Sequence, residues 1–63
     1  MTKLGMARFI VQVLYNLDNA PPEDHFHVKK IARVKKADVA DLYNLAIEAN
    51  VKRIIQNRKY DNG

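Results

Sequence analysis

Apolar residues recur every three or four positions along most of this chain, which is the spacing of amphipathic helices. The first stretch covers residues 3–19, and one stripe along it holds six large apolar side chains: Met6, Phe9, Ile10, Val13, Leu14 and Leu17. Pro21 and Pro22 follow it and cannot continue a helix. The pattern therefore predicts a first helix over about residues 3–19 and a stiff connector over residues 20–24.

Two further helices are predicted after the connector. The second spans about residues 25–35 and turns three apolar side chains inward: Val28, Ile31 and Ala32. Asp24, or the pair of Glu23 and Asp24, is expected to cap it, because a carboxylate there accepts from free backbone N–H groups. Asp38 is in turn the expected N-cap of a third helix over about residues 38–49.

The segment after Asn50 allows two structures. Four apolar residues can extend the third helix to about residue 58: Ile47, Val51, Ile54 and Ile55. Alternatively, Asn50 ends the helix in a left-handed conformation, and residues 51–55 form a short strand, because β-branched side chains favour extended structure. The polar run at 56–59 offers no return strand, which favours the helix. We therefore predict an all-α fold, a single three-helix domain over residues 1–63.

The first predicted helix carries a second apolar stripe on a neighbouring face, formed by Leu4, Val11 and Tyr15. A chain of 63 residues has little other surface with which to cover both stripes. We expect this second stripe to be buried against another copy of the chain, forming a homodimer, or against another protein.

Composition argues against catalysis and metal binding. The chain has no cysteine and only two glycines, so it lacks a thiol nucleophile and a glycine-rich phosphate loop. His25 and His27 are two residues apart, which places them on different sides of a helix, and no third histidine exists. We expect no enzymatic activity, no metal, no cofactor and no small-molecule substrate.

Hydropathy gives no sign of a membrane segment or a signal peptide, because polar residues interrupt every apolar stretch. We therefore expect no membrane association and a cytoplasmic location.

Charge is segregated along the sequence, with a net charge of +4. Residues 29–36 hold five basic side chains and no acid: Lys29, Lys30, Arg33, Lys35 and Lys36. Residues 37–50 hold three acids and no base: Asp38, Asp41 and Glu48. Residues 51–59 are basic again, with Lys52, Arg53, Arg58 and Lys59. A basic balance favours an anionic partner.

Residues 28–46 resemble the helix-turn-helix of DNA-binding domains. The resemblance rests on apolar and small residues at that family's packing positions: Ile31, Ala32, Val34, Ala37, Leu42, Leu45 and Ala46. It departs from the family at Lys36, where a glycine is usual. A strand at 51–55 would make the chain resemble a winged helix instead.

This resemblance implies a small DNA-binding, transcription-regulatory module. The third helix would then read double-stranded DNA with four residues: Val39, Ala40, Tyr43 and Asn44. The nine basic residues of the two basic segments would contact phosphates.

The acids of the third helix favour a different function. Like charges weaken the electrostatic term that supplies much of the affinity for DNA, and Asp41 would stand near a phosphate. The alternative is a non-enzymatic protein-interaction or inhibitor module. It would use the apolar first helix and the acidic face of the third.

Overall fold

The computed structural model describes residues 2–61, with side chains described for residues 2–57. Three helices make up the fold: α1 (Lys3–Leu14), α2 (Phe26–Ala32) and α3 (Lys36–Asp61). No strand occurs within residues 2–61. The predicted all-helical, three-helix fold is confirmed, and of the two structures considered for the tail the helical extension is observed.

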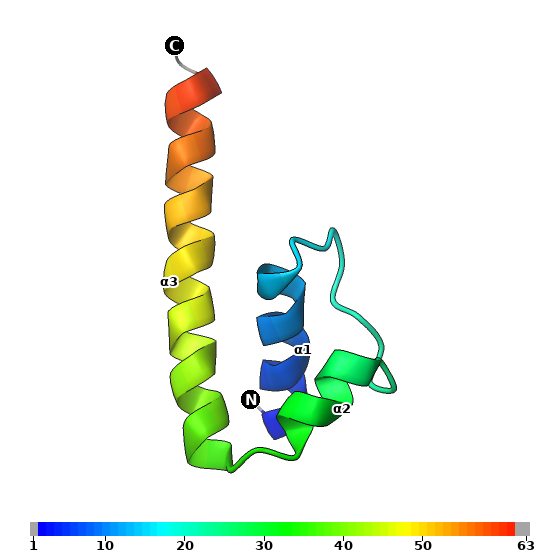
Figure 1. Ribbon diagram of the computed structural model, residues 1–63. Helices are drawn as coiled ribbons and strands as arrows, with labels where there is room; N and C mark the ends of the chain where they lie inside the picture. Colours follow the sequence, from blue (N-terminus) through cyan, green and yellow to red (C-terminus); the bar gives the residue numbers. More distant parts are fainter. Residues whose placement is uncertain (1, 62–63) are drawn as a thin grey trace.

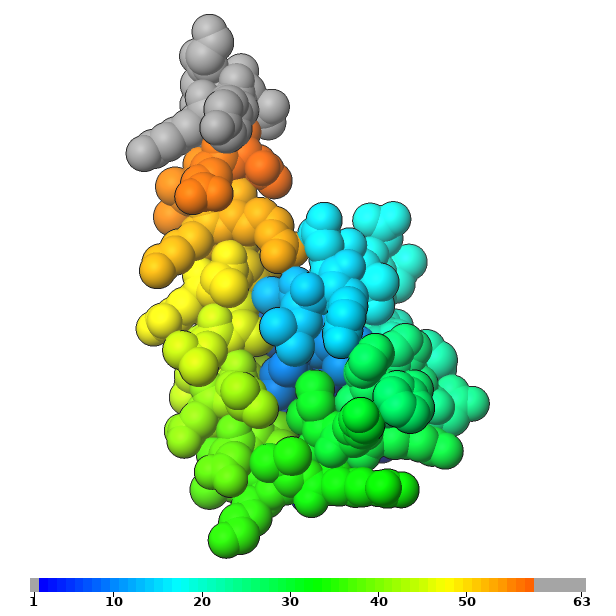
Figure 2. All heavy atoms as spheres, in the orientation of Figure 1, coloured from blue at the N-terminus to red at the C-terminus, as the bar shows by residue number. Residues whose placement is uncertain are grey.

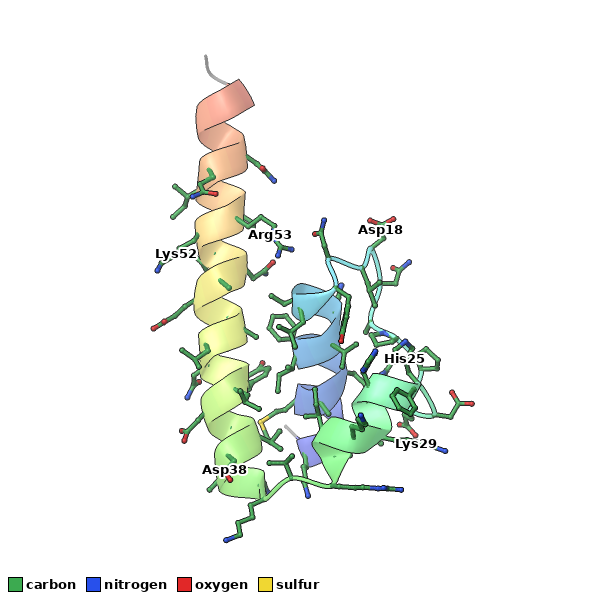
Figure 3. All side chains as sticks on the ribbon, in the orientation of Figure 1. Asp18, His25, Lys29, Asp38, Lys52 and Arg53 are labelled. Carbon is green, nitrogen blue, oxygen red and sulfur yellow. The ribbon has the colours of Figure 1, made fainter. Side chains whose placement is uncertain are left out.

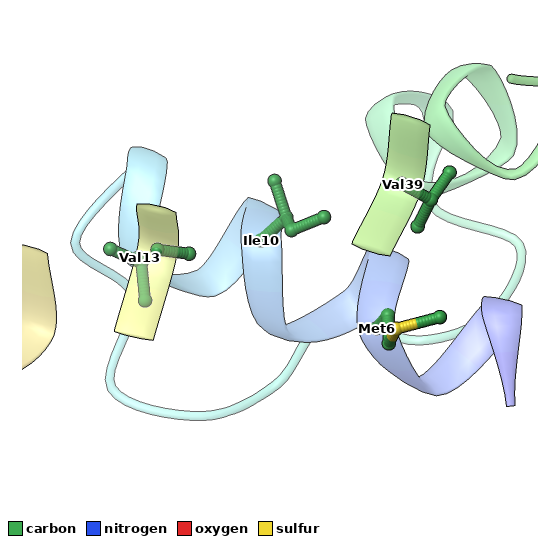
Figure 4. Packing of buried hydrophobic residues seen from close by; sticks show 5 residues of the cluster. Met6, Ile10, Val13 and Val39 are labelled. Carbon is green, nitrogen blue, oxygen red and sulfur yellow. The ribbon is translucent and has the colours of Figure 1, made fainter. Parts of the chain in front are cut away.

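The helix α1 is the central element, and both other helices pack on it (Figure 1). One side of α1 contributes Met6, Ile10 and Val13 to a core with Val39 and Ala46 of α3 (Figure 4). Another side of α1 contributes Ala7 and Val11 to a smaller core with Val28 of α2. The helices α2 and α3 have little contact with each other.

The second apolar stripe of α1 is therefore covered within the chain. Val11 is completely buried and Leu4 packs on the same small core. Of the residues predicted to contact a second copy, only Tyr15 is exposed. The prediction of a dimer interface through Leu4 and Val11 is wrong, because α2 folds back over this stripe and buries it.

The helix α1 ends at Leu14, five residues earlier than the periodicity predicts. Asn16 adopts the left-handed conformation, with φ of 52°. The amide of Leu17 donates to the carbonyl of Gln12 at 2.9 Å, and that of Asn16 donates to Val13 at 3.3 Å. These two bonds form a Schellman motif, which satisfies the last carbonyls of the helix. Leu17 matches the apolar spacing of α1 although it lies after the end of the helix.

The chain then runs back along α1 towards α2. Two polar side chains of α1 bond this segment: Arg8 Nε donates to the carbonyl of Pro21 at 2.7 Å, and Gln12 Nε2 donates to that of Asp18 at 3.5 Å. Pro21 itself is buried. The polar side of α1 thus hydrogen-bonds the connector between α1 and α2.

Both predicted N-caps are also corrected. The N-cap of α2 is His25, whose Nδ1 accepts from the amide of His27 at 3.2 Å, and not Asp24. The helix α2 ends at Ala32, three residues early. The helix α3 begins at Lys36, two residues before the predicted cap, so Asp38 lies inside its first turn. A carboxylate there still interacts favourably with the positive end of the helix.

The left-handed Asn16 gives a direct test of the end of α1. Asn16→Ala and Asn16→Gly both remove the side chain, but only alanine has a Cβ that opposes a positive φ. We expect Asn16→Ala to be less stable than Asn16→Gly by about 1 kcal/mol in urea unfolding followed by circular dichroism. Equal stabilities of the two variants would contradict a left-handed residue at this position.

Candidate functional site

An open apolar groove of about 270 Å³ lies between α1 and α3. Figure 1 shows these two helices side by side, and in Figure 2 their side chains meet, although only a small part of α1 is visible from this side. Seven residues line the groove: Ile10, Val13, Leu14, Leu42, Leu45, Ala46 and Ala49. Two of the four residues from α3 are alanines, whose small side chains leave space between the helices. The larger leucines stand beside this space.

The two leucines at the mouth of the groove are unusually exposed. Leu14 exposes 67% of its surface and Leu45 exposes 61%. Since burial of a leucine side chain contributes roughly 1.5–3 kcal/mol, exposing two of them side by side forgoes a substantial stabilisation. Clustered exposed apolar side chains mark interaction surfaces more often than scattered ones.

Acidic side chains stand beside the leucines of α3. Asp38 precedes Leu42 by four positions, and Asp41 precedes Leu45 by four, so each acid is a neighbour of a leucine on the helix surface. Glu48 follows Leu45 by three positions. All three acids are exposed, and Figure 3 labels Asp38 at the start of α3. The groove therefore has an apolar floor and an acidic border.

The predicted DNA-reading face of α3 is mostly turned into the core. Val39 is completely buried, and Ala40 packs against the same core. The ring of Tyr43 packs edge-on against Phe9, with 5.3 Å between ring centroids. Only Asn44 is exposed. The assignment of Val39 to base contacts is wrong, because α1 covers it completely, and Ala40 and Tyr43 are partly covered on the same side of α3.

The first basic segment does lie on the surface. All five of its side chains are exposed, on α2, on the turn after it and at the first residue of α3: Lys29, Lys30, Arg33, Lys35 and Lys36. Lys30 Nζ lies 4.8 Å from the ring centroid of Phe26, which is itself exposed. These residues form the basic corner of the molecule, at the end of α3 opposite its C-terminus (Figures 1 and 3).

The second basic segment is divided by the fold. Lys52 is exposed. Arg53 instead donates from one guanidinium nitrogen to Asn16 Oδ1 at 2.7 Å and from the other to the carbonyl of Val13 at 3.2 Å. Figure 3 shows Arg53 directed towards α1 and Lys52 directed away from it. Arg53 is thus committed to the end of α1, and the side chains of Arg58 and Lys59 lie outside the described residues.

The two histidines and Tyr15 form an aromatic cluster at the start of α2. The ring of Tyr15 stacks on that of His27 with 4.6 Å between centroids, and its hydroxyl lies 3.5 Å from His27 Nδ1. The rings of His25 and His27 are 5.6 Å apart. His25 Nδ1 caps α2, and the stacking of Tyr15 on His27 joins the end of α1 to α2.

Among the side chains that the structure describes, those of residues 2–57, no group of three or more histidine, cysteine or acidic residues is arranged to hold a metal ion. Within residues 2–61, no helix combines the length and apolarity needed to cross a bilayer. Comparison with protein families, curated proteins and solved structures gives no match to this chain.

The groove was not predicted from the sequence. Leu42 and Leu45 were expected to pack in the core of a helix-turn-helix, so their exposure on the surface was not foreseen. The sequence feature that indicates the groove is the pair Ala46 and Ala49, because small residues beside large ones on one helix face leave a hollow.

Arg53 gives a second test of the fold. We expect Arg53→Met to lower the free energy of unfolding by about 1 kcal/mol, because it removes two hydrogen bonds from a charged donor that is partly exposed. The neighbouring change Lys52→Met is the matched control and should alter stability by less than about 0.5 kcal/mol. Urea unfolding of both variants makes the comparison. Equal losses would mean that Arg53 does not hold the end of α1.

Proposed function

We propose that this protein is a non-enzymatic protein-interaction module. Its groove between α1 and α3 would bind an amphipathic helix of a partner protein, with basic side chains beside the apolar face of that helix. The observation that carries the proposal is the exposure of Leu14 and Leu45 on either side of an apolar hollow with acids along its border.

The dimensions of the groove favour a helix as the ligand. From Leu42 to Ala49 the groove follows two turns of α3, a length of about 10 Å. Such a length accepts apolar side chains from two successive turns of a partner helix, spaced three or four residues apart. In helix-in-groove recognition, apolar side chains at this spacing enter the groove and replace water on its floor.

The acidic border favours a basic ligand. Asp38, Asp41 and Glu48 are exposed on the same helix as the groove leucines. Lysine or arginine side chains flanking the apolar face of a partner helix would lie near these carboxylates. Exposed charges of this kind contribute to specificity and association rate more than to affinity, and salt screens them.

A designed helical peptide of leucine and lysine, with leucines on one face, tests this proposal. We expect it to bind the protein, and Leu45→Ser to weaken binding about tenfold, because about 1.4 kcal/mol of apolar contact is lost. Fluorescence polarisation with a labelled peptide measures the dissociation constant.

Ile55→Ser is the matched control, because it removes a similarly exposed apolar side chain from α3 at a position that does not line the groove. It should leave peptide binding unchanged. Absence of binding at low salt, or equal weakening by both variants, would contradict the groove as the binding site.

Nucleic-acid binding is a second candidate function, favoured by the basic corner. Five exposed cations within eight residues offer phosphate contacts without base readout. Binding of this kind would be independent of sequence, in contrast to the sequence-reading helix that the helix-turn-helix resemblance implies. The acids of α3 would then face away from the phosphates or weaken the contact.

A charge-reversal pair tests this second candidate. We expect Lys35→Glu to weaken binding to a labelled DNA duplex, with affinity that falls steeply as salt is raised. Lys52→Glu changes the net charge equally but lies about 25 Å along α3 from the corner, so it should have a smaller effect. Gel-shift titrations at two salt concentrations compare the variants. No shift at low salt would exclude the candidate.

A further inference from the structure

A second exposed apolar surface lies on the C-terminal half of α3, away from the groove. Ile47, Val51, Ile54 and Ile55 expose between 37% and 51% of their surfaces. None of them lines the groove. On a helix of 3.6 residues per turn, these four positions lie on the side roughly opposite Leu42, Leu45 and Ala49. We call this surface the isoleucine stripe.

Ile54 and Ile55 follow Arg53, in the part of α3 that extends beyond the rest of the fold (Figure 1), whereas Ile47 and Val51 come before it. Arg53 hydrogen-bonds the end of α1, so the helix after it runs past that helix. A helical segment of only a few turns is marginally stable in water. All four stripe residues are β-branched, which lowers intrinsic helix propensity further. The observed helix therefore calls for packing along this side.

The spacing of the stripe suits a second helix as that packing partner. The step from Ile47 to Val51 is four residues and the step to Ile54 is three, which is the alternation of a two-helix seam. Ile55 lies at the edge of the same seam. Isoleucine and valine at successive seam positions pack well against an identical surface.

We propose that the isoleucine stripe pairs with the same stripe of a second copy, with the two α3 helices antiparallel. Charge selects this orientation. Glu48 and Lys52 are both exposed beside the stripe. With the twofold axis near Asn50 and Val51, Glu48 of each copy lies next to Lys52 of the other. A parallel pair would instead place glutamate beside glutamate and lysine beside lysine.

This interface differs from the dimer expected from sequence, which used α1. It leaves the apolar floor of the groove and the basic corner of each copy free, because both lie away from the stripe. Glu48 alone is shared between the acidic border of the groove and the dimer. The dimer and the proposed peptide-binding function therefore use different apolar residues, and either can fail without the other.

Single cysteines test the orientation, since the natural chain has none. Under mild oxidation, Val51→Cys should form a covalent dimer, because the two positions meet near the twofold axis. Ile47→Cys should not, because seven residues of helix rise separate the two copies of this position by about 10 Å, beyond disulfide reach. Cross-linking of both variants would indicate a parallel pair, and cross-linking of neither would overturn the proposal.

Sedimentation equilibrium tests the dimer itself without any cross-link. The unmodified protein should dimerise, Ile54→Asp should be monomeric, and Leu45→Ser in the groove should dimerise as the unmodified protein does. Circular dichroism of Ile54→Asp distinguishes loss of pairing from unfolding. A conservative variant, Ile54→Ala, should weaken dimerisation by at least tenfold while keeping the helix.

Charge reversal gives an independent readout. Glu48→Lys and Lys52→Glu should each weaken the dimer, and the double variant should restore it. A strict monomer at millimolar concentration, with peptide binding in the groove intact, would overturn the dimer and leave the proposed function standing. A dimer that does not bind the peptide would overturn the proposed function and leave the dimer standing.

Discussion

Two-sided burial of α1 is the constraint on which the rest of this structure depends. Among the three helices within residues 2–61, α1 is the one on which both others pack. Its residues Met6, Ile10 and Val13 hold α3, while Ala7 and Val11 hold α2. Since α2 and α3 have little contact with each other, α1 is the element that joins them. Its polar side is committed as well, because Arg8 bonds the connector.

Sequence reasoning recovered the elements of the fold and missed how they are paired. Periodicity identified three helices, since repeated apolar spacing is a local property. The end of α1 could not be read from it, because Leu17 keeps the spacing while Asn16 turns the backbone. The cover over Val11 could not be read either, because it depends on the path of the connector between α1 and α2. The burial of Val39 could not be predicted for the same reason, since the side of a helix that is buried depends on the helices that pack on it.

The sides of α3 differ in their charge and apolar character. One side of the helix packs on α1, one borders the groove with acids, and another carries the isoleucine stripe. The basic corner lies at the other end, on α2, the turn after it and the first residue of α3. The basic corner is therefore separate from Asp38 and Asp41 on the border of the groove. Glu48 and Lys52 of α3 lie together instead, beside the isoleucine stripe.

The contact between Arg53 and the end of α1 has a consequence for how the chain folds. It joins positions 37 and 40 residues apart in sequence, whereas most helical contacts in a bundle are local. Closing so long a loop costs chain entropy before the contact can form. The last turn of α1 should therefore be completed late, after α3 has grown past its middle. In kinetic terms, loss of Arg53 should accelerate unfolding far more than it slows folding.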